Sequence, residues 1–335
     1  MIYWQIGSGD DERNFSQVFL DFGVALVGPG DEGSYKENPE AYEDEGAMTN
    51  ITPLLQMKRG ERIVLRKGRK QIIAVGEIAG EYDYSILFSD IDGWDISHFI
   101  KVKWKDINHR FEKSILGGST LQHLGDERAI KLIESRWDKG KFVKPSRDPD
   151  EKIEEAQELD ESKIEQSLID SGISIKSAEE MTRTIIRVKK LGLWYTKTKN
   201  RYSAEHEIRT FLVIPFFQSL GWPAQKIAIE LGIPSKKIDI VLYNDADKEH
   251  PIAFVETKKI DSGLEFAYRQ LLGYVENFPS VEYLITTTGL RYALYEKQGG
   301  DWNQTAYMNF DKMLDRHCCY PDIEGVTYFI KKLLP

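Results

Sequence analysis

The sequence predicts two domains of mixed α and β structure, one α+β and one α/β, with helices between them. Residues 1–145 contain short apolar β-type segments separated by glycines and acidic turns, a pattern that predicts a small, strongly curved β-barrel with helices. Residues 201–335 combine apolar strand runs with helical periodicity, which predicts a mixed sheet flanked by helices. The chain of 335 residues is long enough for both domains.

The first domain is predicted to contain five strands. Glycine-rich or acidic turns follow several of them, as at residues 28–31 and 80–81. The predicted strands are residues 2–6, 23–27, 62–65, 72–78 and 99–104.

Residues 146–200 are predicted to form a helical connector. Its first helix follows the apolar spacing of Ile153, Leu159, Ile164, Leu168 and Ile169, and Ser171-Gly172 ends it. A second helix is expected from about residue 177 to 191, ending at Gly192.

The most informative pattern lies in the third segment. Asp239 interrupts the apolar run 237–243, and a second apolar run, 252–255, leads directly into Glu256-Thr257-Lys258. Side chains alternate along a strand, so Glu256 and Lys258 share a face. If the two runs pair as a hairpin, Asp239 lies beside Glu256, and two carboxylates and one ammonium meet.

This set of groups fits phosphodiester hydrolysis. Two carboxylates suit Mg²⁺ or Mn²⁺, which leave other coordination positions to water and substrate phosphate. A neighbouring lysine can orient or deprotonate the attacking water. Glu-x-Lys alone is common on solvated strands, but here it follows four consecutive apolar residues, which is typical of a central strand.

Two flanking helices carry further candidates. Glu205 shares a helical stripe with Leu212, and Glu207 shares another with Phe211, so periodicity does not decide which acid faces the site. Glu207 can also be explained as an acid that stabilises the helix N-terminus. Downstream, Gln270-x-x-x-Tyr274 spans one helical turn.

Asp239, then seventeen residues later Glu256-x-Lys258, resembles the PD-(D/E)xK nuclease superfamily. Residues 203–222 resemble the first nuclease helix of type I restriction motor subunits, and Gln270-x-x-x-Tyr274 resembles the recombination-nuclease branch. The roles that this resemblance implies are metal binding by Asp239, Glu256 and Glu205, water activation by Lys258, orientation by Gln270, and phosphate contact or packing by Tyr274. The family spacing relative to Arg209 favours Glu205. Strands at 283–288 and 292–296 are expected to complete the sheet.

In the first domain, residues 60–65 and 74–80 resemble the central hairpin of the PUA/EVE/YTH-like superfamily, as do Trp4 and residues 102–104. The resemblance implies an aromatic pocket for a flipped, modified base. Each aromatic taken alone is more often a core or barrel-packing residue than a pocket wall, and Trp104 is expected in the core. Trp94 is the strongest pocket candidate because it lies in a loop-like segment. The candidate walls are Trp4, Tyr82, Tyr84 and Trp94, and the candidate edge readers are Asp21 and Asp95.

The formal net charge of −9 is unevenly distributed. Residues 148–165 hold nine acids and two lysines, a net −7, which leaves −2 for the rest of the chain. Residues 183–201 hold seven cations and no acid. Two basic groups are candidates for contact with the DNA backbone. Alternatively, the helix group is a solvated surface and the strand group protects an exposed strand edge from aggregation. They are Arg183, Arg187 and Lys190 on one helix face, and Lys101, Lys103 and Lys105 on one strand face.

Other patterns exclude alternative classes. The only cysteines, Cys318 and Cys319, are adjacent, so no disulfide framework is expected. We expect a cytoplasmic protein, because the sequence has no run long enough to span a membrane and no signal-peptide pattern. No G-x-x-x-x-G-K-[ST] motif occurs, so no nucleotide cofactor is expected.

The function that these patterns favour is a Mg²⁺-dependent endonuclease that cuts base-modified double-stranded DNA. It resembles a modification-dependent restriction enzyme acting against phage DNA, and cutting both strands favours a homodimer. Two alternatives stay open at this point: a non-catalytic or RNA-directed reader, and a repair nuclease that recognises DNA structure.

Overall fold

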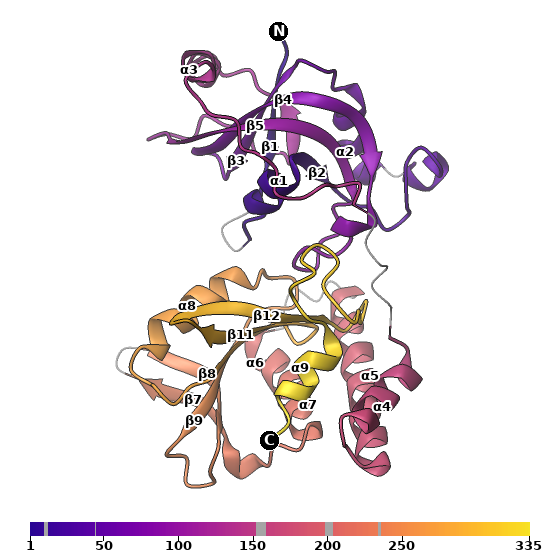
Figure 1. Ribbon diagram of the computed structural model, residues 1–335, viewed down its shortest axis with the longest axis vertical. Coiled ribbons are helices and arrows are strands. Elements are labelled where there is room, and N and C mark those ends of the chain that lie inside the picture. The colour runs from indigo at the N-terminus through magenta and orange to yellow at the C-terminus, as the bar shows by residue number, and fades with distance from the viewer. Residues whose placement is uncertain (10–12, 44, 152–158, 198–203, 234–235) are drawn as a thin grey trace. The chain divides into compact units, whose positions relative to one another are not determined.

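The computed structural model describes residues 1–9, 13–43, 45–151, 159–197, 204–233 and 236–335. The chain forms two compact units, Met1–Glu154 and Glu155–Pro335 (Figure 1). The sequence predicted three parts, with residues 146–200 as a connector. In the structure the helices of that segment belong to the second unit, because their apolar faces pack into its core.

The first unit is built on a six-stranded sheet in the order β2-β5-β4-β3-β1-β6. β1 and β3 are parallel, and the other neighbours are antiparallel. All five predicted strands are present, whereas the short β6 was not predicted. The strands are β1 (Tyr3–Gly7), β2 (Val24–Val27), β3 (Arg62–Lys67), β4 (Gln71–Tyr84), β5 (His98–Arg110) and β6 (Leu121–His123).

The long strands β4 and β5 curl this sheet into a half-barrel (Figure 1). Register shifts at Ile72/Ala74 and Ile78/Tyr82 bend β4 against β5, as bulges do. The expected core residue Trp104 is buried, and its Nε1 donates to the Val24 carbonyl at 3.0 Å. The helices of this unit are α1 (Ser16–Phe22), α2 (Glu45–Gln56) and α3 (Glu127–Trp137).

The second unit contains a mixed six-stranded sheet in the order β12-β11-β10-β9-β8-β7. Only β9 and β10 are parallel. The structure confirms the predicted β8–β9 hairpin and the predicted β10–β11 pair, whereas β7 and β12 were not predicted. The strands are β7 (Ile227–Ile233), β8 (Lys236–Tyr243), β9 (Pro251–Thr257), β10 (Tyr283–Thr287), β11 (Arg291–Gln298) and β12 (Asp301–Asn309).

Helices cover both faces of this sheet. One face packs against α4 (Glu161–Asp170), α5 (Ile175–Lys197), α7 (Ile214–Ser219) and α9 (Val326–Lys332). The other face packs against α8 (Glu265–Val275). The predicted nuclease helix is interrupted: α6 (Glu205–Ile208) continues through a π-helical turn, Arg209–Val213, into α7.

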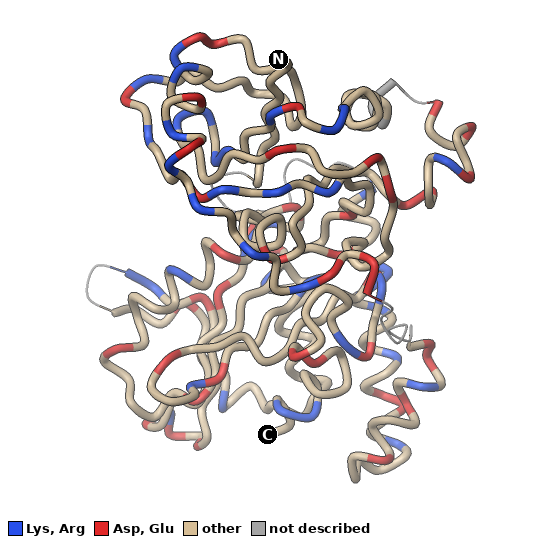
Figure 2. Tube along the Cα trace, turned by 45° about the horizontal axis from the view of Figure 1, so that its top comes forward, with Lys and Arg blue, Asp and Glu red and all other residues tan. Residues whose placement is uncertain are grey.

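Helix α5 extends beyond its predicted end at Gly192. A Cβ at this position would lie 2.3 Å from Leu290 Cδ2, so the glycine allows close packing instead of ending the helix. Figure 2 shows acidic and basic positions interspersed along both units. None of the helices in the described ranges combines the length and apolar character needed to cross a bilayer.

Candidate functional site

The β8–β9 hairpin brings Asp239 next to the Glu-x-Lys sequence. The two strands are antiparallel with Ile240 opposite Val255, which places Asp239 at the level of Glu256. The Thr257 backbone N–H donates to Asp239 Oδ2 at 2.8 Å, and the Thr257 hydroxyl donates to the same oxygen at 2.6 Å. These bonds fix the Asp239 carboxylate against the end of β9.

Glu256 and Lys258 form a buried ion pair. Lys258 Nζ donates to Glu256 Oε1 at 2.8 Å, and the two residues are only 7% and 5% exposed, respectively. Burial, followed by the nearby Asp239 carboxylate, raises the pKa of Glu256 to about 7 despite the lysine. Its second oxygen, Oε2, is buried without a hydrogen-bond partner among the described residues. An orphaned carboxylate oxygen of this kind is suited to a cation ligand.

The Asp239 carboxylate also accepts a hydrogen bond from a buried arginine. Arg209 Nη1 donates to Asp239 Oδ1 at 2.7 Å, and Nη2 donates to Glu230 Oε1 at 2.8 Å. Sequence reasoning used Arg209 only as a spacing marker and did not consider Glu230. The alternation in the run 227–233 could have revealed a strand whose one acid lies opposite Asp239.

The structure distinguishes the two helix acids. The Glu205 carboxylate contributes to the raised pKa of Glu256, so it lies within electrostatic reach of the hairpin. Glu207 instead contributes to the raised pKa of Tyr195 on α5. Glu205 is exposed at the start of α6.

Helix α8 carries the last two predicted residues toward the hairpin. Glu256 lies on the same strand face as Phe254, which packs with Tyr274 of α8. Burial raises the pKa of Tyr274, with a further contribution from the Glu256 and Asp239 carboxylates. Gln270, one turn earlier, has a buried Oε1 that accepts no hydrogen bond within the described part of the chain.

The donor set fits a hard divalent cation held by two carboxylates. Within the described ranges, no three His, Cys, Asp or Glu side chains are close enough together to hold a metal ion, so Glu205 does not complete a triad with Asp239 and Glu256. Unscreened carboxylates repel one another, and Asp239 is turned toward Arg209 and Thr257. Mg²⁺ commonly binds through one or two carboxylates and several waters. Glu256 Oε2, which accepts no hydrogen bond from the described residues, and Asp239 Oδ1, which accepts one, both retain acceptor capacity for a cation.

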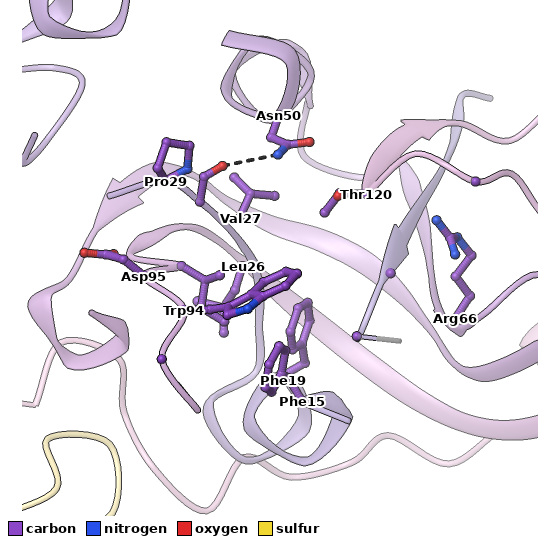
Figure 3. A pocket seen from close by; sticks show the side chains of 16 residues that line it. Phe15, Phe19, Leu26, Val27, Pro29, Asn50, Arg66, Trp94, Asp95 and Thr120 are labelled. Carbon is purple, nitrogen blue, oxygen red and sulfur yellow. Dashed lines mark hydrogen bonds between the residues drawn. The ribbon is translucent and has the colours of Figure 1, made fainter. Parts of the chain in front are cut away.

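The first unit contains a pocket of about 520 Å³. Figure 3 shows Trp94 beside Phe15 and Phe19, with Asn50 across the opening and Arg66 at the far end. Trp94 is 43% exposed, and the Arg13 guanidinium lies 4.8 Å from its ring centroid. Asn50 Nδ2 donates to the Gly28 carbonyl at 3.2 Å, which ties α2 to the pocket wall. The cavity is therefore mostly apolar and aromatic, with few polar groups, as ligand pockets usually are.

Of the predicted pocket residues, Trp94 and Asp95 line this cavity, and the other four lie elsewhere. Trp4 is buried, stacks on His123, and donates from Nε1 to Glu61 at 2.7 Å. Asp21 accepts a hydrogen bond from Gln17 on the surface of α1.

Tyr82 and Tyr84 form a cluster with buried His98. The Tyr82 hydroxyl is 2.7 Å from His98 Nδ1 and accepts from the Tyr35 backbone N–H, and the Tyr84 hydroxyl donates to the Gly30 carbonyl. These bonds hold the segment that follows the pocket residues Gly28 and Pro29. The aromatic walls supplied by Phe15 and Phe19 were not predicted, although their i,i+4 spacing on or beside one helix is a recognisable signal.

The predicted basic groups differ in accessibility. On α5, Arg183, Arg187 and Lys190 are exposed, and Arg183 pairs with Glu179. On β5, Lys103 is exposed and Lys101 pairs with Asp150. Lys105 is buried instead of exposed: its Nζ donates to the Trp137 carbonyl and lies close to the Trp137 and Phe142 rings.

Comparison with known proteins relates the second unit to restriction enzymes. Residues 204–310 match the family described as the N terminus of type I restriction enzyme R proteins, and this range includes every predicted catalytic residue. Residues 4–123 match a domain of unknown function, DUF8426. Among curated protein sequences, none matches this chain.

One similar solved structure is the YTH domain of the Zygosaccharomyces rouxii MRB1 protein in complex with N6-methyladenosine RNA. It is 16% identical, with a TM-score of 0.24, and the similarity covers 40% of this chain and 85% of that one. At this TM-score the likeness carries no conclusion about the fold or ligand of this chain.

Proposed function

We propose that this protein is a metal-dependent DNA endonuclease that is directed by its first unit to base-modified DNA. The observation that carries the proposal is the group formed by partly exposed Asp239 and buried Glu256 and Lys258 at one hairpin, in which Glu256 Oε2 has no hydrogen-bond partner among the described residues. The match of residues 204–310 to a restriction-enzyme family supports the same chemistry.

Asp239 Oδ1 and Glu256 Oε2 would hold Mg²⁺ or Mn²⁺, with Glu205 assisting through water. When bound, such an ion supplies charge neutralisation and lowers the pKa of bound water. Lys258 is already fixed by Glu256 and would orient the attacking water. Water oxygen bonds to phosphorus, the bond from phosphorus to one sugar oxygen breaks, and that oxygen takes up a proton. Gln270 would orient Lys258 or the backbone, and Tyr274 would contact phosphate or support the site from below.

The proposal for the first unit rests on the pocket around Trp94. A base taken out of a duplex needs flat apolar surfaces for its faces and polar groups for its edge. Trp94, Phe15 and Phe19 provide the surfaces, and Asn50 and Asp95 provide polar atoms at the rim. A modified cytosine in double-stranded DNA is the proposed ligand, and defence against phage is the proposed role. Because one site cuts one strand at a time, the proposal includes a homodimer.

The experiment is a cleavage assay with Mg²⁺ on matched duplexes carrying unmodified, methylated, hydroxymethylated or glucosylated cytosine. We expect cutting of at least one modified duplex and none after chelation of the metal. Equal cutting of all duplexes would remove the reader from the proposal and keep the nuclease. The absence of cutting on every duplex and with either Mg²⁺ or Mn²⁺ would contradict the proposed activity.

A further inference from the structure

The guanidinium of Arg209 lies between two carboxylates on neighbouring strands. It is 7% exposed and reaches Asp239 of β8 with one nitrogen and Glu230 of β7 with another, at 2.7 and 2.8 Å. A surface ion pair of this type would be weak, but these bonds form at a largely buried arginine. Arg209 therefore has a defined orientation relative to the hairpin.

The position of Glu230 follows from strand register. Ile229 pairs with Ile240 and Leu231 pairs with Ile238, so Glu230 lies opposite Asp239. Its backbone has φ of +53°, a left-handed conformation that non-glycine residues seldom adopt within a strand. Such strain persists where the surrounding structure enforces it. Here Glu230 Oε1 is held by buried Arg209, whereas the contact of Oε2 with Lys237 is an exposed surface pair that contributes little.

The two carboxylate oxygens of Asp239 accept different numbers of hydrogen bonds. Oδ2 accepts two hydrogen bonds from Thr257, which use both of its lone pairs. Oδ1 accepts one bond from Arg209 and retains one lone pair. Together these donors on opposite sides fix the plane of the carboxylate, with Oδ1 as the oxygen that can accept a cation.

We propose that Arg209, braced by Glu230, is a positioning residue that presents Asp239 Oδ1 to the metal. This inference rests on the proposed nuclease function and adds two residues to its machinery. An arginine is required because its planar fork reaches two carboxylates at once, whereas lysine offers a single ammonium. Arg209 begins the π-helical turn, so the backbone is irregular where the guanidinium leaves the helix.

The Mn²⁺ affinity of Arg209 variants shows whether Arg209 acts by orienting Asp239 or only through its positive charge. Removal of a cation beside a metal site should tighten Mn²⁺ binding if charge alone matters, whereas loss of carboxylate orientation should weaken it. Partners that orient metal ligands typically contribute about 10–100-fold to affinity or activity. The full-length chain would be titrated with Mn²⁺ and free Mn²⁺ measured by electron paramagnetic resonance, in parallel with cleavage of modified DNA.

We expect Arg209→Gln and Arg209→Lys both to weaken Mn²⁺ binding and cleavage by about 10–100-fold. Glu230→Ala should weaken both, whereas Glu230→Gln, which keeps an acceptor for Arg209, should restore most of the loss. Lys237→Gln is the matched control, because it removes an exposed cation that contacts only Glu230 in this network, and it should stay close to the unmodified protein.

Two results would overturn the inference: wild-type Mn²⁺ affinity in Arg209→Lys, or tighter binding in Arg209→Gln. If the Arg209 variants do not fold by circular dichroism, the Glu230→Ala and Glu230→Gln pair decides, and equal Mn²⁺ affinity in these two variants overturns it. A natural chain that neither binds Mn²⁺ nor cuts DNA would contradict the proposed function itself, which is a separate outcome.

Discussion

The pocket of the first unit and the hairpin of the second unit differ in the groups that form them and in the free energy needed to bury those groups. The pocket is lined mainly by aromatic and aliphatic groups, and Trp94 is half exposed at its rim. The hairpin buries Glu256 beside Asp239, which costs free energy unless other charges offset it. Lys258 and Arg209 supply those charges. A reading surface can thus form from packing alone, whereas a phosphodiester-cutting site needs a compensated set of buried ions.

The largest expected effect is the loss of cleavage in Lys258→Ala. Removal of one fixed cation from a reacting phosphate site should lower the cleavage rate by about 10²–10³-fold or more. The affinity for modified DNA should stay unchanged, because the pocket lies in the other unit. Single-turnover cleavage and equilibrium binding would be measured separately, with the exposed neighbour substituted as Lys259→Ala as the control. Loss of both properties together would break the division between the two regions.

The buried Glu256 carboxyl predicts that the stability of the second unit depends on pH. Glu256 has a folded pKa of about 7 against an ordinary value of 4.5, so the native state holds this proton more tightly. Its contribution is present below about pH 4.5 and is lost as pH rises through 7. We expect Glu256→Gln to gain on the order of 3 kcal/mol in unfolding free energy relative to the natural chain between pH 4.5 and 8.

Urea unfolding of the metal-free proteins at pH 4.5 and 8 would measure this difference. The comparison between two variants cancels the titration of all other carboxyl groups to first order. If the difference in unfolding free energy between Glu256→Gln and the natural chain were the same at both pH values, Glu256 would ionise normally. That result would contradict the argument from burial.

The pocket predicts a smaller effect that is confined to binding. Trp94→Ala should weaken binding of the preferred modified duplex by about 1–3 kcal/mol, which is typical for loss of one base–aromatic stack. Mn²⁺ affinity should not change. Phe142→Ala removes another exposed aromatic of the same unit and serves as the control in fluorescence-anisotropy titrations. Equal losses for the two variants would show that the pocket has no special role.

The smallest expected effect concerns exposed charge on α5. Arg187→Gln should weaken binding of modified and unmodified DNA equally, and should reduce the slope of log affinity against log salt by about 0.9 if Arg187 neutralises one phosphate. The measurement is the binding constant over a series of salt concentrations. An unchanged slope would identify this face as solvated surface.

Sequence patterns predicted the central hairpin because its information is local. The runs 237–243 and 252–255 are mainly apolar, close in sequence and able to pair in only a few registers, which brings Asp239 beside Glu256. The Arg209–Glu230 pair required the order of the sheet edge and the path of a helix that changes to π geometry. The alternation of residues 227–233 is a local signal for β7, but neither its place beside β8 nor the path of Arg209 is encoded in a short window, which is why the pair was not recognised.

In the first unit, too, the strands could be predicted from local sequence, whereas most residues of the site could not. Its five main strands followed from local apolar runs, but four of the six candidate pocket residues lie outside the cavity. Trp4, Tyr82 and Tyr84 are aromatic residues on strands, where packing and hydrogen bonding occupy their rings. Trp94 was identified because a loop tryptophan has no packing role in the strand pattern. Phe15 precedes α1 and Asn50 lies on α2, and only the tertiary fold brings these two residues together.

The most direct test of the account is a crossed comparison of the natural chain, Lys258→Ala and Trp94→Ala on matched modified and unmodified duplexes, with binding measured in Ca²⁺ and cleavage in Mg²⁺. We expect Lys258→Ala to bind modified DNA normally without cutting it. We expect Trp94→Ala to lose the preference for modified DNA. If Lys258→Ala still cuts at the natural rate, the β8–β9 hairpin is not the catalytic centre, and the central claim fails.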